Sequence, residues 1–389
     1  MPKNKYLIAA AGMTIQLSIG SVYAYSIWVE PINKALGWDA HLLKNAFILA
    51  ICFLGLSAAF LGRFVEKIGP TKAGMLAAIF YGLGLIGAGF SIYLQSIMLF
   101  YLFFGVISGI GLGLGYITPV GTVLKWFPEK PGFASGLIIM SFAFGSIIAS
   151  QVIMPFTRIF GLSNTFYILG SVYFTCMLLA ALYLESPKKT NDQKPITEKQ
   201  LAPKKFNILK QSMFYGLWLL LFLNTVCGIA IISKAAILGK EYANLNSNQV
   251  ILFVGLIGLC NGLGRLFWSS ISDKIGRWTT FMTFLSIELV CFAVLAFTTN
   301  ALLFQILVFI IISCYGGAFA TIPAFIKDIF GVDQLGPVLG YVLTAWAAAG
   351  IVGPVLISFS DKPDIFLVFS AIIGFAIIVG FTMKHKAIV

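Results

Sequence analysis

The sequence predicts an all-α polytopic membrane protein with 12 transmembrane helices in two six-helix bundles. Of its 389 residues, 59% are hydrophobic and only 10% are charged, whereas ordinary soluble domains are about 25% charged. Twelve apolar segments approach or exceed the roughly 20 residues that a bilayer-spanning helix needs. One hydrophilic stretch, residues 185–210, separates the first six segments from the last six.

The chain therefore divides into a first bundle (1–187), a cytoplasmic linker (188–210) and a second bundle (211–389). The linker is rich in Lys, Pro, Asn and Gln, a composition that favours a mobile tether. The predicted spans are 6–30, 43–62, 73–93, 97–119, 133–157, 163–184, 211–234, 249–270, 278–298, 301–325, 337–360 and 364–383.

The distribution of cations predicts the orientation. With both termini in the cytoplasm, 19 Lys and Arg residues fall in inner segments and 6 in outer segments, and the remaining cation, Arg265, lies inside a span. This is a strong positive-inside bias. The formal net charge of +12 therefore needs no nucleic-acid partner. The short loops favour a bacterial inner membrane, and because one chain supplies both bundles we expect a monomer.

An internal repeat places similar charged loops in both bundles. Glu66 and Lys67 follow the second span, and Asp273, Lys274 and Arg277 follow the eighth. A carboxylate at a helix end can pair across the bundles and interact with the N-terminus of a neighbouring helix. The arrangement resembles the signature loop of the major facilitator superfamily, which latches the cytoplasmic ends of the bundles. The alternative is that these charged loops only follow the positive-inside rule and have no latch function.

Arg265 is the most informative single residue. It lies eight residues before Asp273, so at 1.5 Å per residue its Cα is about 12 Å inside the helix end. A buried Arg is costly unless paired, which makes it a candidate binding residue. Its partner is an anion, either Glu288 or Glu30 of the protein or a substrate carboxylate.

Two carboxylates are candidates for proton coupling. Glu288 lies in the middle of the ninth span, where it fits a coupling group with a raised pKa, a structural partner, or a protonated residue at a helix interface. Glu30 precedes Pro31 near the outer end of the first span, and a helix-end role is as plausible there as coupling.

Other chemistry is disfavoured. Six Cys lie unpaired inside apolar runs and the chain has 2 His, so we expect neither a disulfide set nor a metal site, and no cofactor. Without a Walker loop or a catalytic triad, an enzyme or an ATP-driven pump is disfavoured. Glycines 109, 111, 113 and 115 favour close helix packing, and the run 350–354 predicts a bent or broken eleventh helix.

Several longer segments resemble the oxalate:formate antiporter family of the major facilitator superfamily, a relative of the monocarboxylate transporters. They are residues 20–25 with Pro31, residues 125–136, the run ending in Arg265, and residues 315–331. The resemblance covers essentially all 12 spans. It implies the major facilitator fold and a carrier of small organic anions that works by alternating access.

The resemblance also implies binding residues. Arg265 matches an arginine that binds the substrate carboxylate, and Tyr23, Tyr116 and Tyr315 match cavity aromatics. The oxalate carrier has a second cation, a lysine, where this chain has Trp346. Two cations suit a dianion, whereas one cation suits a monoanion. We therefore expect a monocarboxylate such as lactate, pyruvate or formate, carried by proton symport or anion exchange.

Three alternatives remain open at this stage. Trp346 can reshape the cavity for a larger carboxylated ligand, such as a carboxylate siderophore. The chain can instead be an exporter of amphipathic compounds in which Arg265 is structural, although the glycine–proline element of many drug antiporters is absent from residues 133–157. The third alternative, a membrane sensor descended from a transporter, is disfavoured by the short tails.

Overall fold

The computed structural model describes residues 4–187, 208–359 and 364–388, and within those ranges the chain is helical with no strand. Twelve helices are long and apolar enough to cross a membrane. The predicted fold class is therefore confirmed. The predicted linker, residues 188–210, lies almost wholly outside the described residues.

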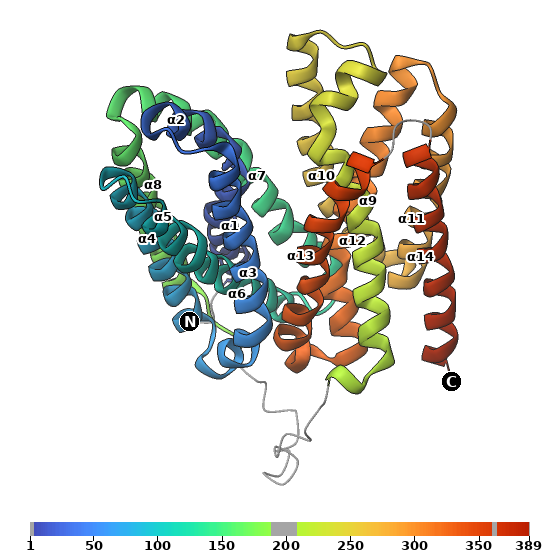
Figure 1. The fold of residues 1–389 in the computed structure, drawn as a ribbon. Helices are drawn as coiled ribbons and strands as arrows, with labels where there is room; N and C mark the ends of the chain where they lie inside the picture. The colour runs from blue at the N-terminus through green and yellow to red at the C-terminus, as the bar shows by residue number, and fades with distance from the viewer. Residues whose placement is uncertain (1–3, 188–207, 360–363, 389) are drawn as a thin grey trace, which may run out of the picture.

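The helices form two groups of six spans side by side (Figure 1). The first half contains α1 (Lys5–Gly20), η1 (Ser21–Ala24), α2 (Ser26–Leu36), α3 (Ala40–Ile68), α4 (Pro70–Tyr93), α5 (Ile97–Phe100), η2 (Tyr101–Ile107), α6 (Ser108–Trp126), α7 (Pro131–Phe160) and α8 (Leu162–Tyr183). The second half contains η4 (Ile208–Lys210), α9 (Ser212–Tyr242), α10 (Ser247–Ile275), α11 (Arg277–Phe297), α12 (Ala301–Phe330), η5 (Val332–Gln334), α13 (Leu335–Phe359) and α14 (Asp364–Ile388).

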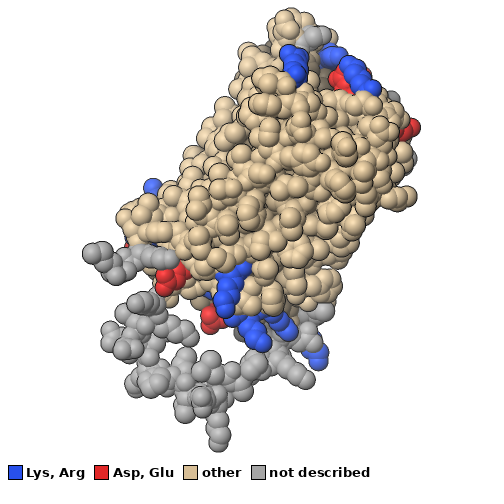
Figure 2. Space-filling model, turned by 90° about the vertical axis from the view of Figure 1, so that its left-hand side faces the viewer, with Lys and Arg blue, Asp and Glu red and all other residues tan. Residues whose placement is uncertain are grey.

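The surface matches a bilayer. On the face that Figure 2 shows, charged side chains gather toward the two ends of the molecule and a broad uncharged belt lies between them. Exposed apolar side chains such as Phe60, Leu179 and Val290 occur along the spans. A belt of this kind suits contact with lipid tails, because in the hydrocarbon region a helix satisfies its own backbone and needs no polar exterior.

The first span differs from the prediction of one segment over 6–30. It is α-helical to Gly20, tightens into a 3₁₀ turn at Ser21–Ala24, and continues as α2 beyond the spanning segment. Helix packing explains where the change lies. A Cβ on Gly20 would collide with the carbonyl oxygen of Phe142 on α7, so α1 and α7 touch backbone to backbone there. The Ser21 hydroxyl bonds the Ser18 carbonyl (2.7 Å) and the Tyr81 hydroxyl (2.6 Å).

The prediction of a broken eleventh span is wrong, whereas a bend there stays a prediction. α13 continues from Leu335 to Phe359 with Pro354 inside it. Gly353 lies against α9, where a Cβ would be 2.6 Å from the Val226 carbonyl oxygen. The glycine therefore provides a close helix contact, and packing against α9 supports a helix that a proline would otherwise interrupt.

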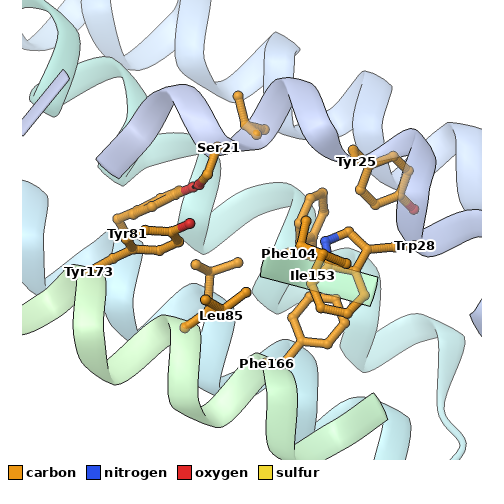
Figure 3. Close-up of a pocket in the computed structure, with 11 residues that line it drawn as sticks. Ser21, Tyr25, Trp28, Tyr81, Leu85, Phe104, Ile153, Phe166 and Tyr173 are labelled. Atoms are coloured by element: carbon orange, nitrogen blue, oxygen red, sulfur yellow. The ribbon is translucent and has the colours of Figure 1, made fainter. Parts of the chain in front are cut away.

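A small cavity lies beside the break of the first span (Figure 3). Ser21, Tyr81 and Tyr173 line its polar end, and Trp28 and Phe166 are among its apolar walls. Its volume of about 20 Å³ is enough for one water molecule and too small for a carboxylate substrate. All the residues that line it belong to the first half, so it is not the site between the halves.

The two halves touch at the linker end and separate at the opposite end. Near the linker end, the Ser135 hydroxyl bonds the Ala320 carbonyl across the halves at 2.7 Å. Farther along α10, a Cβ on Gly262 would lie 3.5 Å from Phe144, but at Gly258 and Gly255 it would meet nothing within 4 Å. These three glycines share one face of α10. The space between the halves therefore opens away from the linker. The helices of the two halves also diverge toward that end (Figure 1).

Candidate substrate-binding site

Arg265 lies where the halves meet, on α10, and only 2% of its surface is exposed. Its Nε donates to Asn261 Oδ1 (3.3 Å), and its Nη1 donates to the carbonyl oxygen of Ile139 on α7 (2.9 Å). The guanidinium carbon lies 5.5 Å from the centre of the Phe319 ring. Among the described residues no carboxylate pairs with Arg265. Its buried charge therefore lacks an anionic partner, which is costly unless a ligand supplies one.

Five aromatic side chains form a closed ring of contacts around this region. Successive ring centres are 5.1–6.1 Å apart, and the angles between ring planes are 63–85°. Edge-to-face contacts of this kind are favourable for aromatic pairs. In order around the ring, the residues are Tyr23, Phe142, Tyr116, Phe319 and Trp346. The first three come from the first half and the last two from the second, so both halves contribute to this aromatic ring.

The three predicted tyrosines gather near Arg265. Tyr23, Tyr116 and Tyr315 each lie within electrostatic range of its guanidinium. The Tyr116 hydroxyl is buried and has no hydrogen-bond partner among the residues that the structure describes, although the Tyr116 carbonyl accepts from Gln16 Nε2 at 3.1 Å. A buried hydroxyl without a partner is unfavourable. It therefore offers a donor to a bound anion.

The two predicted coupling carboxylates lie apart from Arg265. Glu288, on α11, is 1% exposed, and its Oε2 accepts from Asn224 Nδ2 at 2.7 Å. Glu30, on α2, is exposed and pairs with Lys34 at 2.5 Å. The hydrogen bond from Lys34 lowers the pKa of Glu30 below its usual value. Glu30 is therefore ionised at neutral pH, and neither acid is the partner of Arg265. A coupling role for either stays a prediction.

The predicted latch residues divide into two unequal groups. Asp273 accepts from the backbone N–H groups of Gly132 and Phe133 at the start of α7, both at 2.8 Å, so it joins the halves. Arg277 pairs with Asp273 (2.9 Å) and with Asp328 (2.8 Å).

Glu66 instead pairs with Lys125 of its own half at 2.5 Å. Lys67 and Lys274 are exposed, and neither forms an ion pair within the described part of the chain.

Residues 8–354 match the model of the Major Facilitator Superfamily. The chain belongs to the major facilitator superfamily. In structure it is similar to the proton:xylose symporter XylE, with a TM-score of 0.76 at 13% identity over 97% of this chain and 95% of that one.

Several relatives share the superfamily and most of the chain. The chain is 26% identical to the MFS-type transporter YhjX of Escherichia coli, over 90% of this chain and 86% of the relative. It is 27% identical to the oxalate:formate antiporter of Oxalobacter formigenes, over 90% and 82% respectively. It is 25% identical to the apicoplast pyruvate carrier 1 of Toxoplasma gondii, over 80% and 68%.

Sequence reasoning missed three residues of this superfamily member's site. Asn261 precedes Arg265 by four residues and Phe319 follows Tyr315 by four, so each shares a helix face with a residue that was identified. That spacing is a signal that could have found them. Phe142 has no such local signal, because its place in the ring depends on the crossing of α1 and α7. In the residues that the structure describes, no group of three metal-ligating side chains occurs.

Proposed function

We propose that the protein is a secondary transporter of a small organic monoanion, a monocarboxylate such as lactate, pyruvate or formate. The buried guanidinium of Arg265 carries this proposal, since it lacks a carboxylate partner among the described residues. A substrate carboxylate would accept from the guanidinium in the planar geometry that arginine favours. The free hydroxyl of Tyr116 would donate a further hydrogen bond to the bound anion.

The surroundings of Arg265 favour a substrate with one charge. Tyr23, Phe142, Phe319 and Trp346 offer aromatic surface around a single cation. A second carboxylate would be desolvated there without a partner cation, at a cost of several kcal/mol. Two relatives are named for carboxylate transport, an oxalate:formate antiporter and a pyruvate carrier. Their names support the carboxylate class.

The transport cycle would alternate the opening between the two ends. The structure opens away from the linker, and the cation bias assigns the linker end to the cytoplasm. In this orientation both termini are cytoplasmic, and the structure is an outward-facing state of a protein of the bacterial inner membrane. Substrate would reach Arg265 from outside, after which the contacts of Ser135 and Asp273 between the halves would open. One chain suffices for this, as a monomer, and transport would be coupled to proton symport or anion exchange.

Thermal unfolding of the purified protein tests the site. We expect one class within a panel of mono-, di- and tricarboxylates to raise the melting temperature, because a ligand that binds the folded state stabilises it by mass action. The increase should be lost in Arg265→Ala and reduced in Arg265→Lys, which keeps the charge but loses the planar guanidinium that can bind a carboxylate through two hydrogen bonds. The exposed Arg158→Ala serves as the matched control and should keep the full response.

Transport assays complete the test. Uptake of the stabilising carboxylate should fall to background in Arg265→Ala while the amount of protein in the membrane is unchanged. Full uptake in both Arg265 variants would overturn the role of this residue. Stabilisation by tricarboxylates alone, or by amphipathic cations alone, would replace the monocarboxylate with one of the other substrate classes.

A further inference from the structure

A buried acid and a buried amide join two helices of the second half. Glu288 of α11 and Asn224 of α9 are 1% and 0% exposed. Asn224 Nδ2 donates to Glu288 Oε2 at 2.7 Å, while Asn224 Oδ1 has no hydrogen-bond partner in the described part of the chain. The amide therefore has its donor satisfied and its acceptor unsatisfied, next to a carboxyl group whose protonated form has one O–H to donate.

Among the described residues, none supplies a positive charge beside Glu288. The titratable groups within electrostatic range are Cys227 on α9, Cys291 on α11 and Cys314 on α12. No ion pair in the described ranges includes Glu288. An isolated carboxylate in such a place would lose its hydration without compensation, whereas a carboxylic acid and an amide can satisfy each other with two hydrogen bonds.

We propose that Glu288 is a proton-binding site, occupied in this outward-facing state, whose O–H donates to Asn224 Oδ1. The ligand is a single proton, taken from external water by the carboxylate. The resulting neutral acid–amide pair would link α9 to α11. It also explains why the Asn224 oxygen lies buried with no other donor.

The proton site is connected to the substrate site by close packing. Gly228 lies one turn beyond Asn224 on α9, and a Cβ there would overlap the ring of Tyr315, whose backbone neighbour is Cys314. Tyr315 in turn lies within electrostatic range of Arg265. A displacement of Tyr315 by a bound anion would therefore push on α9 close to the acid–amide pair.

Charge balance then gives the site a role, and this step rests on the proposed function. With Glu288 protonated and no anion bound, Arg265 leaves one uncompensated positive charge inside the protein. A monoanion on Arg265 brings the buried charge to zero, and it is zero again when both the anion and the proton have left. Low-dielectric interiors favour such neutral states. The carrier would thus move one monocarboxylate with one proton, and the proton would bind first.

Infrared difference spectroscopy tests the protonated acid without any transport. The wild type minus Glu288→Gln spectrum should contain the C=O band of a protonated carboxyl group, and that band should shift on exchange into D₂O. In Asn224→Leu the band should move to higher frequency, because its hydrogen bonds are lost. The control Glu30→Gln should remove a carboxylate band instead. A carboxylate band in the Glu288→Gln difference would overturn the proposal.

Uptake into proteoliposomes tests the coupling. With lactate or pyruvate as the probe, a proton gradient that is acidic outside should drive accumulation by the wild type. In Glu288→Gln this accumulation should fall by about tenfold or more, while exchange of labelled for unlabelled substrate stays within about twofold. Undiminished accumulation in Glu288→Gln would overturn the coupling role. If the wild type moves no carboxylate at all, the proposed function falls and the coupling with it, whereas the infrared result still decides the acid–amide pair.

Discussion

The two charged loops of the repeat occupy equivalent places in the two halves but make different contacts. In the second half, Asp273 reaches across to two backbone N–H groups of α7 and pairs with Arg277. In the first half, Glu66 pairs with Lys125 of its own half. Among the described residues of the second half, none donates a hydrogen bond to Glu66, although a Cβ on Gly336 would lie only 3.3 Å from its Oε1.

The receiving helices explain much of this difference. α7 begins Pro131-Gly132-Phe133, so proline occupies the first position, where its missing N–H costs nothing, and the next two residues have free donors. α13 begins Leu335-Gly336-Pro337, so proline removes the donor at the third position. A sequence repeat can thus preserve the shape of a loop while only one copy closes the halves through charge-assisted hydrogen bonds.

The largest difference between the two loops should appear when the carboxylate of Asp273 or of Glu66 is removed. Asp273→Ala loses two hydrogen bonds to a charged acceptor, together worth roughly 3 kcal/mol, and should lower the ratio of outward-open to inward-open molecules by about a hundredfold. Glu66→Ala breaks a part-buried pair within one half. It removes no contact between the halves, so it should change that ratio by less than about fivefold.

The opening can be followed by labelling from outside. Gly258→Cys faces open space between the halves, so a membrane-impermeant maleimide should label it in the outward-open state, with Cys260→Ser to remove the neighbouring thiol. Labelling should fall in Asp273→Ala and persist in Glu66→Ala. Equal losses in both variants would mean that the two loops contribute equally to closure.

Adding a methyl group to the glycine that faces each loop, Gly132 or Gly336, should give the next largest difference between the two loops. In Gly132→Ala the Cβ would overlap the Ser269 carbonyl oxygen and lie 2.7 Å from Arg277 Nη1. We expect the halves to be forced apart there at a cost of about 1–3 kcal/mol. In Gly336→Ala the nearest atoms are 3.3 and 3.4 Å away, which a small shift accommodates, at less than about 1 kcal/mol. Maleimide labelling of Gly258→Cys reports both effects, and a larger loss in Gly336→Ala would contradict the comparison.

The sequence predicts the spans, the two halves and the repeated loops, but not the different contacts that the two loops make. Apolar length and the hydrophilic stretch at residues 185–210 were sufficient for 12 spans and two halves, because a helix in lipid is dictated by local composition. Arg265 stood out for the same reason, as a charge at a depth that lipid disfavours. The break after Gly20 was not predictable, since it depends on contact with Phe142, more than 100 residues away. The aromatic ring likewise requires two halves that no local pattern places together.

Restoring the missing donor should make the weaker loop resemble the stronger one. Pro337→Ala adds an N–H near the start of α13, beside the carboxylate of Glu66. If Glu66 accepts it, the outward-open state should be stabilised by about 1 kcal/mol, with slower transport and stronger labelling of Gly258→Cys. The double variant Pro337→Ala with Glu66→Ala should cancel the gain. A gain that persists without Glu66 would mean that the proline acts through the helix backbone instead.

The smallest effects should come from the two lysines that the repeat shares. Lys67 and Lys274 are exposed and have no ion-pair partner among the described residues, so each change to Ala should alter stability by less than about 0.5 kcal/mol. Transport should stay within about twofold, because a rate follows the free energy exponentially. Topology should also hold, since either lysine is one of 19 cations that the predicted orientation assigns to inner segments. A tenfold loss of transport in either variant, with normal protein levels, would place that lysine in a contact that forms only when the halves rearrange, and the two loops would then share a function.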